Sequence, residues 1–485
     1  MVKKGLLGGK LNYLTKDEVM AIHSATLDVL EQVGMTCESI PIMEVFNKAG
    51  ADVDFEDKRI RIPQHLVEEV LNKTPKHFVL CGRNPKNDIL IENSRIYFGL
   101  GGTPTPYVRD IDTGEYRRPT KKDVADATRL GDALPNLSFI MSIAGAFDVP
   151  YQVEYLHEFE VMFNNTEKPI VYSTPGTDGA RRVLEMAATI TGGFDELRKR
   201  PFLSLYSETP SPLTITKSNE NMIEFAKAGV PITLGPMPMA GATAPITISG
   251  AAVVGNTENL AAIALIQIVK PGTPVIYAGW SGSMDLRSGR FTYGSPEFTM
   301  GSAGINAAMA RYYNLPTFGF GGCTDSKLPD AQAGAETMMN ALMSGLCGIN
   351  LIHDCGYLAG GDAGSLEMAV ICDEVVGMVS HIVRGVKVDD ESLAVDVIRS
   401  VGPGGHFLSQ KHTLKFVDRE IFIPKIFNRA SEEVWRTTGR KDIREVAKER
   451  AKKLLKEHYP EPLTKDIQHK LSRILMEAEK ELVKK

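Results

Sequence analysis

The sequence is poor in cysteine and in long apolar runs. Six cysteines are spread over 485 residues, and no two of them are spaced as CxxC. We therefore expect reduced thiols in an intracellular protein rather than a disulfide framework. No apolar stretch reaches the ~18 residues that a membrane span needs, and the first residues lack the apolar core of a signal peptide. The composition predicts a soluble cytoplasmic protein with no membrane partner.

A strongly basic balance is also missing. The formal net charge is −5 at pH 7, which argues against a nucleic-acid partner, because phosphate contacts need basic surfaces. The charge is uneven. Residues 408–485 hold 20 Lys and Arg against 13 Asp and Glu, a net charge of +7, which leaves −12 for the remainder. Such a segment is typical of solvated amphipathic helices, and it would also suit docking of an acidic partner.

Four common catalytic or nucleotide-binding motifs are absent. There is no GxGxxG that opens a helix after a first strand and no GxxxxGK[ST]. The sequence therefore lacks the motifs that best indicate a nucleotide-binding fold. Neither GxSxG nor HExxH occurs, so the sequence matches no serine-hydrolase or zinc-protease template.

What the chain does contain is a repeated unit. Between residues 137 and 363, a short apolar run, a burst of Gly, Pro, Ser or Thr, and an amphipathic helix follow one another seven times. Residues such as Thr216, Ser295 and Ser365 are good helix caps. The runs are continuously apolar, as in strands buried on both faces of a parallel sheet. They begin at Leu137, Pro169, Pro201, Val230, Thr273, Leu315 and Ile349.

Seven such units predict an α/β fold with a closed (β/α)8 barrel, the TIM barrel. An open doubly wound sheet is the alternative, and the missing nucleotide fingerprints weigh against it. The eighth strand could come from residues 405–414 or from the N-terminal part. We predict an N-terminal α/β extension over residues 1–135, with a hairpin at 95–119, then the barrel over 136–407 and a basic helical extension over 408–485, both extensions packed on the barrel.

In such a barrel, the site lies at the carboxyl ends of the strands. Aromatic and methionine residues outnumber charges there, and the loops 236–255 and 279–299 are long. A pocket walled by rings suits a quaternary ammonium group, which donates no hydrogen bond and is held by π faces at ~0.5–2 kcal/mol per contact. Packing of the barrel mouth is the simpler explanation for any one ring, except for Trp280, which stands among Gly and Ser. The candidate rings are Tyr172, Tyr206, Trp280, Phe320 and Tyr357.

His353 followed by Asp354 allows several roles: general base, metal ligand, or hydrogen-bond donor to a substrate carboxylate. A zinc site would need Cys323 and Cys355 with His353, and alternation along the strand would turn His353 and Cys355 to the same face. Small buried core residues are the commoner role for such cysteines. Glu208 with Asp325 could form an acid–base pair.

Five segments together resemble the trimethylamine methyltransferase superfamily over nearly the whole chain, in particular its members without pyrrolysine that act on quaternary amines such as glycine betaine. The segments are AIHSATLDVLEQVGM, the stretch from FGLGGTPTPYVRD to GDALPN, PMPMAGATAPITISGAAVVGNTENLAAI, GGCTDSKLPDAQAGAE and NLIHDCGYLAGG.

The resemblance implies a TIM barrel whose mouth meets the cobalt corrinoid of a small partner protein. It therefore implies a methyltransferase that moves a methyl group from a quaternary amine, such as glycine betaine, to Co(I). The founding enzymes carry pyrrolysine, which this sequence lacks, and this departure favours a permanently charged substrate over trimethylamine. We expect Trp280, Tyr172, Tyr206 and Phe320 to cage the ammonium head.

The remaining expected substrate contacts are His353, Arg290, Tyr357 and Glu208, with His353 and Arg290 (or Arg287) on a substrate carboxylate. We assign no catalytic acid, base or metal, because the expected mechanism is one of positioning. A zinc-dependent thiol methyltransferase and a non-catalytic quaternary-amine binder remain open alternatives. Because barrels of this size often pair, we also expect a homo-oligomer.

Overall fold

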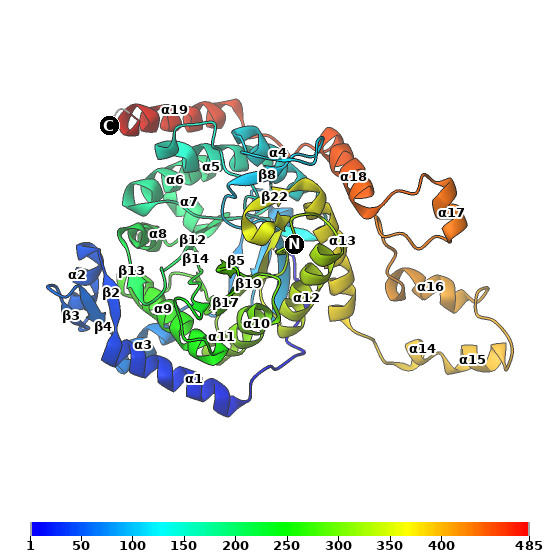
Figure 1. Cartoon of the computed structure of the whole chain (residues 1–485), viewed down its shortest axis with the longest axis horizontal. Helices are drawn as coiled ribbons and strands as arrows, with labels where there is room; N and C mark the ends of the chain where they lie inside the picture. The colour runs from blue at the N-terminus through cyan, green and yellow to red at the C-terminus, as the bar shows by residue number, and fades with distance from the viewer. Residues whose placement is uncertain (1, 484–485) are drawn as a thin grey trace.

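The computed structural model, which describes residues 2–483, contains a barrel of eight parallel strands (Figure 1). Every neighbouring pair runs parallel, and a bridge between Tyr277 and Thr317 closes the ring between β16 and β19. The predicted TIM barrel and its seven strands are confirmed. In order around the ring the strands are β7 (Arg95–Leu100), β10 (Leu137–Ile140), β11 (Ile170–Tyr172), β12 (Leu203–Ser207), β14 (Ile232–Leu234), β16 (Val275–Ile276), β19 (Phe318–Phe320) and β20 (Leu351–Cys355).

The strand missing from the predicted array is β7, which pairs with β10 on one side and β20 on the other. The N-terminal part therefore supplies it. The other suggested source, residues 405–414, is wrong, because that stretch forms a loop and the start of α16 (Lys411–Glu420). Since β7 and α4 (Lys121–Ala133) form the first βα unit, the predicted boundary at residue 135 falls after that unit rather than before it.

Helices surround the strands as an outer layer (Figure 1). Their apolar faces and the outer faces of the strands form two large buried clusters, which is why the strand sequences are apolar on both sides. In chain order these helices are α4, α5 (Glu154–Asn165), α6 (Gly176–Thr191), α7 (Phe194–Lys199), α8 (Asn221–Ala228), α9 (Ile248–Val269), α10 (Pro296–Thr299), α11 (Asn306–Tyr313), α12 (Ala331–Cys347) and α13 (Leu366–Arg384).

Helix α9 is long and apolar enough to cross a membrane by length and composition, but 78% of its most apolar stretch is buried inside the protein. It packs against α8 of the barrel and against three helices of the N-terminal part. Its apolar surface is therefore used as protein core.

Side chains that point into the barrel fill it below the mouth. Large residues such as Phe139, Tyr206 and Phe318 are almost fully buried there. The hairpin of β5 (Phe78–Leu80) and β6 (Ile89–Ile91) contributes Leu80 and Ile89 to the same cluster. The interior is thus a packed core that supports the open end from below.

The N-terminal residues form a small α/β unit beside the barrel (Figure 1). Its sheet has the order β13–β2–β4–β3, in which β13 (Thr214–Ile215) belongs to the loop after β12. That pairing and the packing of its helices on α9 attach the unit to the barrel. The other elements are α1 (Lys16–Asp28), β2 (Met35–Cys37), α2 (Ile40–Lys48), β3 (Asp52–Asp54), β4 (Arg59–Arg61) and α3 (Gln64–Lys73), while β1 (Leu6–Leu7) pairs with β7.

Two small sheets are built from the loops at the carboxyl ends of the barrel strands. One has the order β21–β22–β8–β9 and the other β15–β17–β18. The predicted hairpin at 95–119 is therefore split: β8 and β9 pair with each other, whereas β7 joins the barrel. The strands are β8 (Tyr107–Arg109), β9 (Tyr116–Arg117), β15 (Met239–Ala240), β17 (Gly282–Asp285), β18 (Arg290–Phe291), β21 (Tyr357–Leu358) and β22 (Ala363–Ser365).

The C-terminal residues form two parts, one that lies on the barrel and one that projects from it. Helices α18 (Ile443–Glu457) and α19 (Lys465–Leu482) lie on the barrel, against α13 and α4 and against α5 and α6, respectively. By contrast, residues 386–441, which we call the arm, project away from the barrel (Figure 1). The sequence predicts that residues 386–407 of the arm belong to the barrel and that residues 408–441 pack on it, yet most of the arm lies away from the barrel, whose last helix ends at Arg384 (Figure 1). Its helices are α14 (Asp390–Leu393), α15 (Val395–Val401), α16 and α17 (Glu432–Thr437).

Candidate functional site

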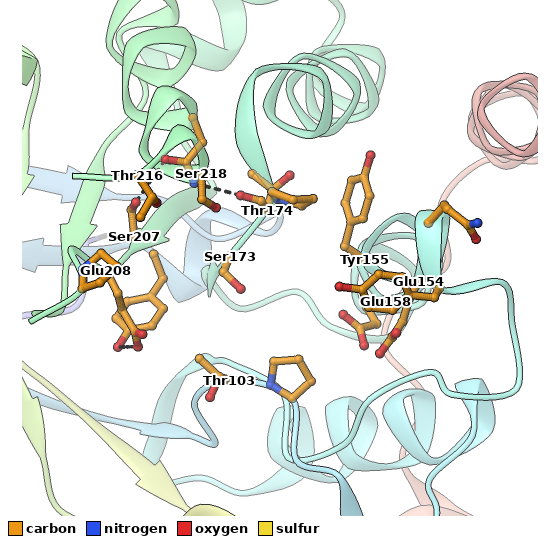
Figure 2. A pocket seen from close by; sticks show the side chains of 17 residues that line it. Thr103, Glu154, Tyr155, Glu158, Ser173, Thr174, Ser207, Glu208, Thr216 and Ser218 are labelled. Carbon is orange, nitrogen blue, oxygen red and sulfur yellow. Dashed lines mark hydrogen bonds between the residues drawn. The ribbon is translucent and has the colours of Figure 1, made fainter. Parts of the chain in front are cut away.

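Two adjoining cavities open at the carboxyl ends of the barrel strands, and both are lined by Glu208 and Pro210. The first, of about 430 Å³, we call the aromatic cavity; Phe291, Tyr293 and two methionines line it. The second, of about 520 Å³, we call the hydroxyl cavity (Figure 2). The place of both agrees with the position of ligand sites in this fold.

A dense group of rings supports the aromatic cavity. Tyr293 packs edge-on against Phe291, with centroids 4.7 Å apart, and against Phe320 at 5.7 Å. Below them, Phe320 lies 4.2 Å from Trp280 and 4.5 Å from His353. These rings come from the loop after β16, from β19 and from β20, so the closed barrel brings them together.

Trp280 lies in the floor of this group. Its side chain has no exposed surface, and its Nε1 donates to the backbone oxygen of Phe318 at 2.8 Å. It stacks at 5.7 Å on His353. The sequence-predicted residues Trp280, Phe320, Tyr206 and His353 are thus gathered in one cluster, with Trp280 beneath the cavity rather than on its wall.

Tyr172 is placed elsewhere. Its ring packs edge-on against Phe159 of α5, with centroids 5.4 Å apart, and its hydroxyl donates to Glu158 Oε2 at 3.0 Å. It therefore faces the helix layer, outside the ring cluster of the barrel interior. Because strand β11 is buried on both faces, its apolar pattern does not indicate on which face Tyr172 lies.

Glu208 stands where the two cavities meet, with its side chain open to solvent there. Tyr206 donates its hydroxyl to Glu208 Oε1 at 2.5 Å. The surrounding barrel wall raises the pKa of the Glu208 carboxyl, while the Tyr206 hydroxyl and His353 oppose that rise. A carboxylate in this position can face a cation that enters from either cavity.

His353 and Asp354 are both almost fully buried under the mouth. Within residues 2–483, neither ring nitrogen of His353 has a well-formed hydrogen bond, although Nδ1 lies 2.7 Å from Asp354 Oδ1. Burial raises the pKa of the Asp354 carboxyl, and His353 lowers it. A Cβ on Gly102 would lie 2.6 Å from Asp354 Oδ1 and 2.9 Å from the hydroxyl of Tyr357, so only glycine leaves room for them.

The remaining predicted residues lie at the edge of the site. Arg290 lines the aromatic cavity, but its guanidinium is paired with the carboxylate of Asp362. Tyr357 is buried, and its hydroxyl donates to the backbone oxygen of Thr103. Neither side chain therefore offers a free charge to the cavities.

The zinc alternative required His353 and Cys355 to face the same way. Asp354 between them has a left-handed φ of 74°, and the pairing of β20 with β7 shifts register at this point. His353 consequently packs inside the barrel, while Cys355 turns outward. There the free thiol of Cys372 and burial raise the pKa of the Cys355 thiol. In the described part of the chain, no group of three or more His, Cys, Asp or Glu side chains could hold a metal ion.

Tyr293 is not among the site residues predicted from the sequence, although it lies in one of the two long loops at the barrel mouth. Asp325 holds Tyr293 in place by accepting the backbone N–H groups of Tyr293 and Gly294 at 3.0 and 2.9 Å. Asn340 Nδ2 donates to the backbone oxygen of Tyr293 at 2.9 Å. The sequence does contain one indication, because Asp325 follows β19 at the end of the barrel where the loops converge. That Asp325 binds the backbone of Tyr293 is visible only in the fold.

Comparison with known proteins shows matches along the full chain. The sequence model described as trimethylamine methyltransferase (MTTB) matches residues 7–482. The chain is 39% identical to the trimethylamine methyltransferase MttB of Desulfitobacterium hafniense strain DCB-2, over 99% of this chain and 97% of that one. It is 35% identical to a glycine betaine methyltransferase of D. hafniense strain Y51, over 99% of each chain. The trimethylamine methyltransferase MttB of Methanosarcina thermophila is 32% identical, over 95% of this chain and 96% of that one.

Proposed function

Because the chain belongs to the trimethylamine methyltransferase family, we propose that it takes a methyl group from a quaternary amine and transfers it to the Co(I) corrinoid of a partner protein. The observation that carries the proposal is the aromatic cavity, in which rings and thioethers surround the carboxylate of Glu208, while the second lining carboxylate, Asp362, is paired with Arg290. A quaternary ammonium head donates no hydrogen bond, so π faces and a nearby carboxylate are its natural contacts.

The reaction needs no proton from the protein. The N–CH3 bond breaks, its electron pair stays on nitrogen, a neutral tertiary amine leaves, and the methyl group goes to reduced cobalt. The task of the chain is to hold the amine with one methyl group directed out of the barrel mouth. This agrees with a site whose acid, Glu208, is bonded to Tyr206 rather than aimed at a leaving group.

Tyr293 lines the aromatic cavity with Glu208 and would contact the ammonium head, while Tyr206 lines the hydroxyl cavity and donates to Glu208. Trp280, Phe320 and His353 lie below and would fix the positions of those rings. The roles predicted for Trp280 in a cage and for His353 on a substrate carboxylate stay predictions. Glycine betaine and related betaines, which the sequence favours, are the first substrates to assay.

The partner would approach over the mouth, where aromatic side chains are exposed. Tyr107 and Phe147 are 43% and 39% exposed, and the guanidinium of Arg118 lies over both rings at 5.2 and 5.3 Å. Tyr151 is 85% exposed beside the hydroxyl cavity. Exposed aromatic residues with an arginine are typical of contact surfaces between proteins.

The decisive assay measures methylation of a reduced corrinoid protein in the presence of the enzyme and one amine at a time. We expect methylation with at least one quaternary amine and none with trimethylamine. Methylation with trimethylamine alone would contradict the proposal. A Tyr107→Ala variant should slow transfer without changing amine binding, since Tyr107 lies outside both cavities.

A further inference from the structure

The hydroxyl cavity is lined by polar side chains that take no part in the proposed binding of the ammonium head. It lies beside the aromatic cavity and shares Glu208 with it. Figure 2 shows Glu154 and Glu158 of α5 directed into the cavity from one side, with Thr103 facing them. Hydroxyl groups line much of the rest, from Ser173, Thr174, Ser207, Thr216 and Ser218.

The acidic and basic side chains of this lining are all glutamates. Three glutamates contribute to it, and among its described lining residues there is no Lys, Arg or His. Glu158 is 2% exposed; it accepts the hydroxyl of Tyr172 and the backbone N–H of Ala146, both at 3.0 Å. Among the described lining residues of both cavities, Arg290 of the aromatic cavity is the basic one, and it is paired with the carboxylate of Asp362.

This chemistry discriminates between substrate tails. A carboxylate lodged here would lose its hydration beside glutamates and find no cation to replace it, which is costly. A hydroxyl group, in contrast, can donate to a glutamate and accept from a serine or threonine. A tail without charge and with a donor therefore fits the cavity, and an anionic tail does not.

We infer that the substrate is a quaternary ammonium alcohol, whose head lies in the aromatic cavity and whose hydroxyl tail lies in the hydroxyl cavity against Glu154 and Glu158. The inference rests on the proposed function. Such a substrate loses one N-methyl group to the reduced corrinoid, keeps the electron pair of the broken bond on nitrogen, and leaves as a neutral dimethylamino alcohol. Glu154 and Glu158 act as specificity-determining residues.

The test uses two probes with the same trimethylammonium head and a two-carbon tail: choline, which ends in a hydroxyl, and glycine betaine, which ends in a carboxylate. Titration calorimetry on the full chain should give a Kd for choline at least about tenfold lower than that for glycine betaine, a difference of roughly 1.4 kcal/mol. Tetramethylammonium, which has no tail, should bind more weakly than choline. Equal or tighter binding of glycine betaine would overturn the inference.

Variants test whether Glu154 and Glu158 cause the difference between the two Kd values. A Glu154→Gln, Glu158→Gln double variant should bring the two Kd values together, while Glu185→Gln, an exposed change of the same kind on α6, should leave their ratio unchanged. A ratio that the double variant does not alter would also overturn the inference. If glycine betaine is bound and demethylated in preference to choline, the proposed function stands and only this inference fails. If none of the three probes binds, the proposed function itself fails.

Discussion

Glu158 is a buried carboxyl group whose pKa the fold raises. Burial raises its pKa to about 8, and the N–H of Ala146 and the hydroxyl of Tyr172 only partly offset this, while neighbouring Glu154 adds to it. A raised carboxyl pKa means that the folded state binds the proton more tightly than the unfolded state. The stabilisation is complete below the unfolded pKa and is lost as pH rises toward 8.

Replacing Glu158 by Gln removes this pH dependence while keeping an acceptor for Tyr172. From about pH 5 to pH 8, the free energy of unfolding of the wild type should fall relative to that of the variant by up to about 1.4 kcal/mol per pH unit. Urea denaturation at several pH values measures the difference. A constant difference across this range would contradict a buried, protonated Glu158; Glu185→Gln serves as the exposed control.

Tyr293 tests the aromatic cavity directly. Tyr293→Ala should raise the Kd of a quaternary amine by roughly 3- to 30-fold, since one cation–π contact contributes ~0.5–2 kcal/mol. Tyr293→Phe keeps the ring and should bind nearly as the wild type does. Calorimetry with tetramethylammonium measures both variants, and equal losses for Phe and Ala would show that the ring face is not the contact.

Replacing Trp280 is expected to change the stability of the protein, because Trp280 is a fully buried residue of the barrel interior. Trp280→Ala should lower the free energy of unfolding by about 3–5 kcal/mol through the cavity that it leaves. The other tryptophan, Trp435 on the arm, is only half-buried, so Trp435→Ala should cost much less. Denaturant titration compares the two, and similar losses would contradict the assigned place of Trp280.

At the scale of elements, one carboxylate helps to hold the part of the loop between β16 and α10 that carries Tyr293. Asp325, which follows β19, accepts two backbone N–H groups of that loop, at Tyr293 and Gly294. Asp325→Ala should therefore free Tyr293 and weaken amine binding about tenfold, with little change in the free energy of unfolding, because the loop lies on the surface of the barrel mouth. Comparing Kd and urea midpoint for this variant separates positioning from stability; a large loss of stability with an unchanged Kd would refute the assignment.

Strand β20 shows why alternation failed as a guide. A strand with regular alternation would turn His353 and Cys355 to one face. The left-handed backbone at Asp354 reverses that order, so the thiol joins the helix layer and the imidazole joins the rings. Because this position holds Asp and not Gly, the sequence does not indicate a positive φ here. A positive φ at a non-glycine residue is a strained backbone conformation that is typical of functional sites.

At the scale of the whole molecule, the arm exposes several large apolar residues. Val386, Val388, Leu408 and Leu414 are 84%, 74%, 82% and 73% exposed, and α16 has no buried residue. Because every copy carries the same arm reaching beyond its own barrel, a second copy is the partner that would cover it by symmetric exchange. The homo-oligomer expected from the sequence stays a prediction, and the arm is the segment on which to test it.

A Leu408→Glu, Leu414→Glu variant should therefore lower the molar mass measured by light scattering, if the arm joins copies, and leave the barrel folded. Met476→Glu on α19, where Met476 is also exposed, is the matched control and should not alter the mass. A wild-type chain that is monomeric at micromolar concentration would contradict the expectation.

The barrel was predictable because its signals are local and repeated. Seven apolar runs and the capped helices between them specify βα units wherever they occur in the chain, and parallel strands joined by helices close in few ways. The first strand, β7, escaped the pattern because the loop after it carries a second pair of strands, β8 and β9, which made the stretch read as one hairpin.

The sequence by itself determined the barrel, the family, and a mouth rich in rings, since each follows from residue types along the chain. Only the tertiary structure decided which rings meet. It turned Tyr206 inward and Tyr172 outward, set Tyr293 beside Glu208, and paired Arg290 with Asp362. The reason is physical: both faces of each strand are apolar, so the direction of a side chain depends on register and loop path, and these are fixed by packing across the closed barrel.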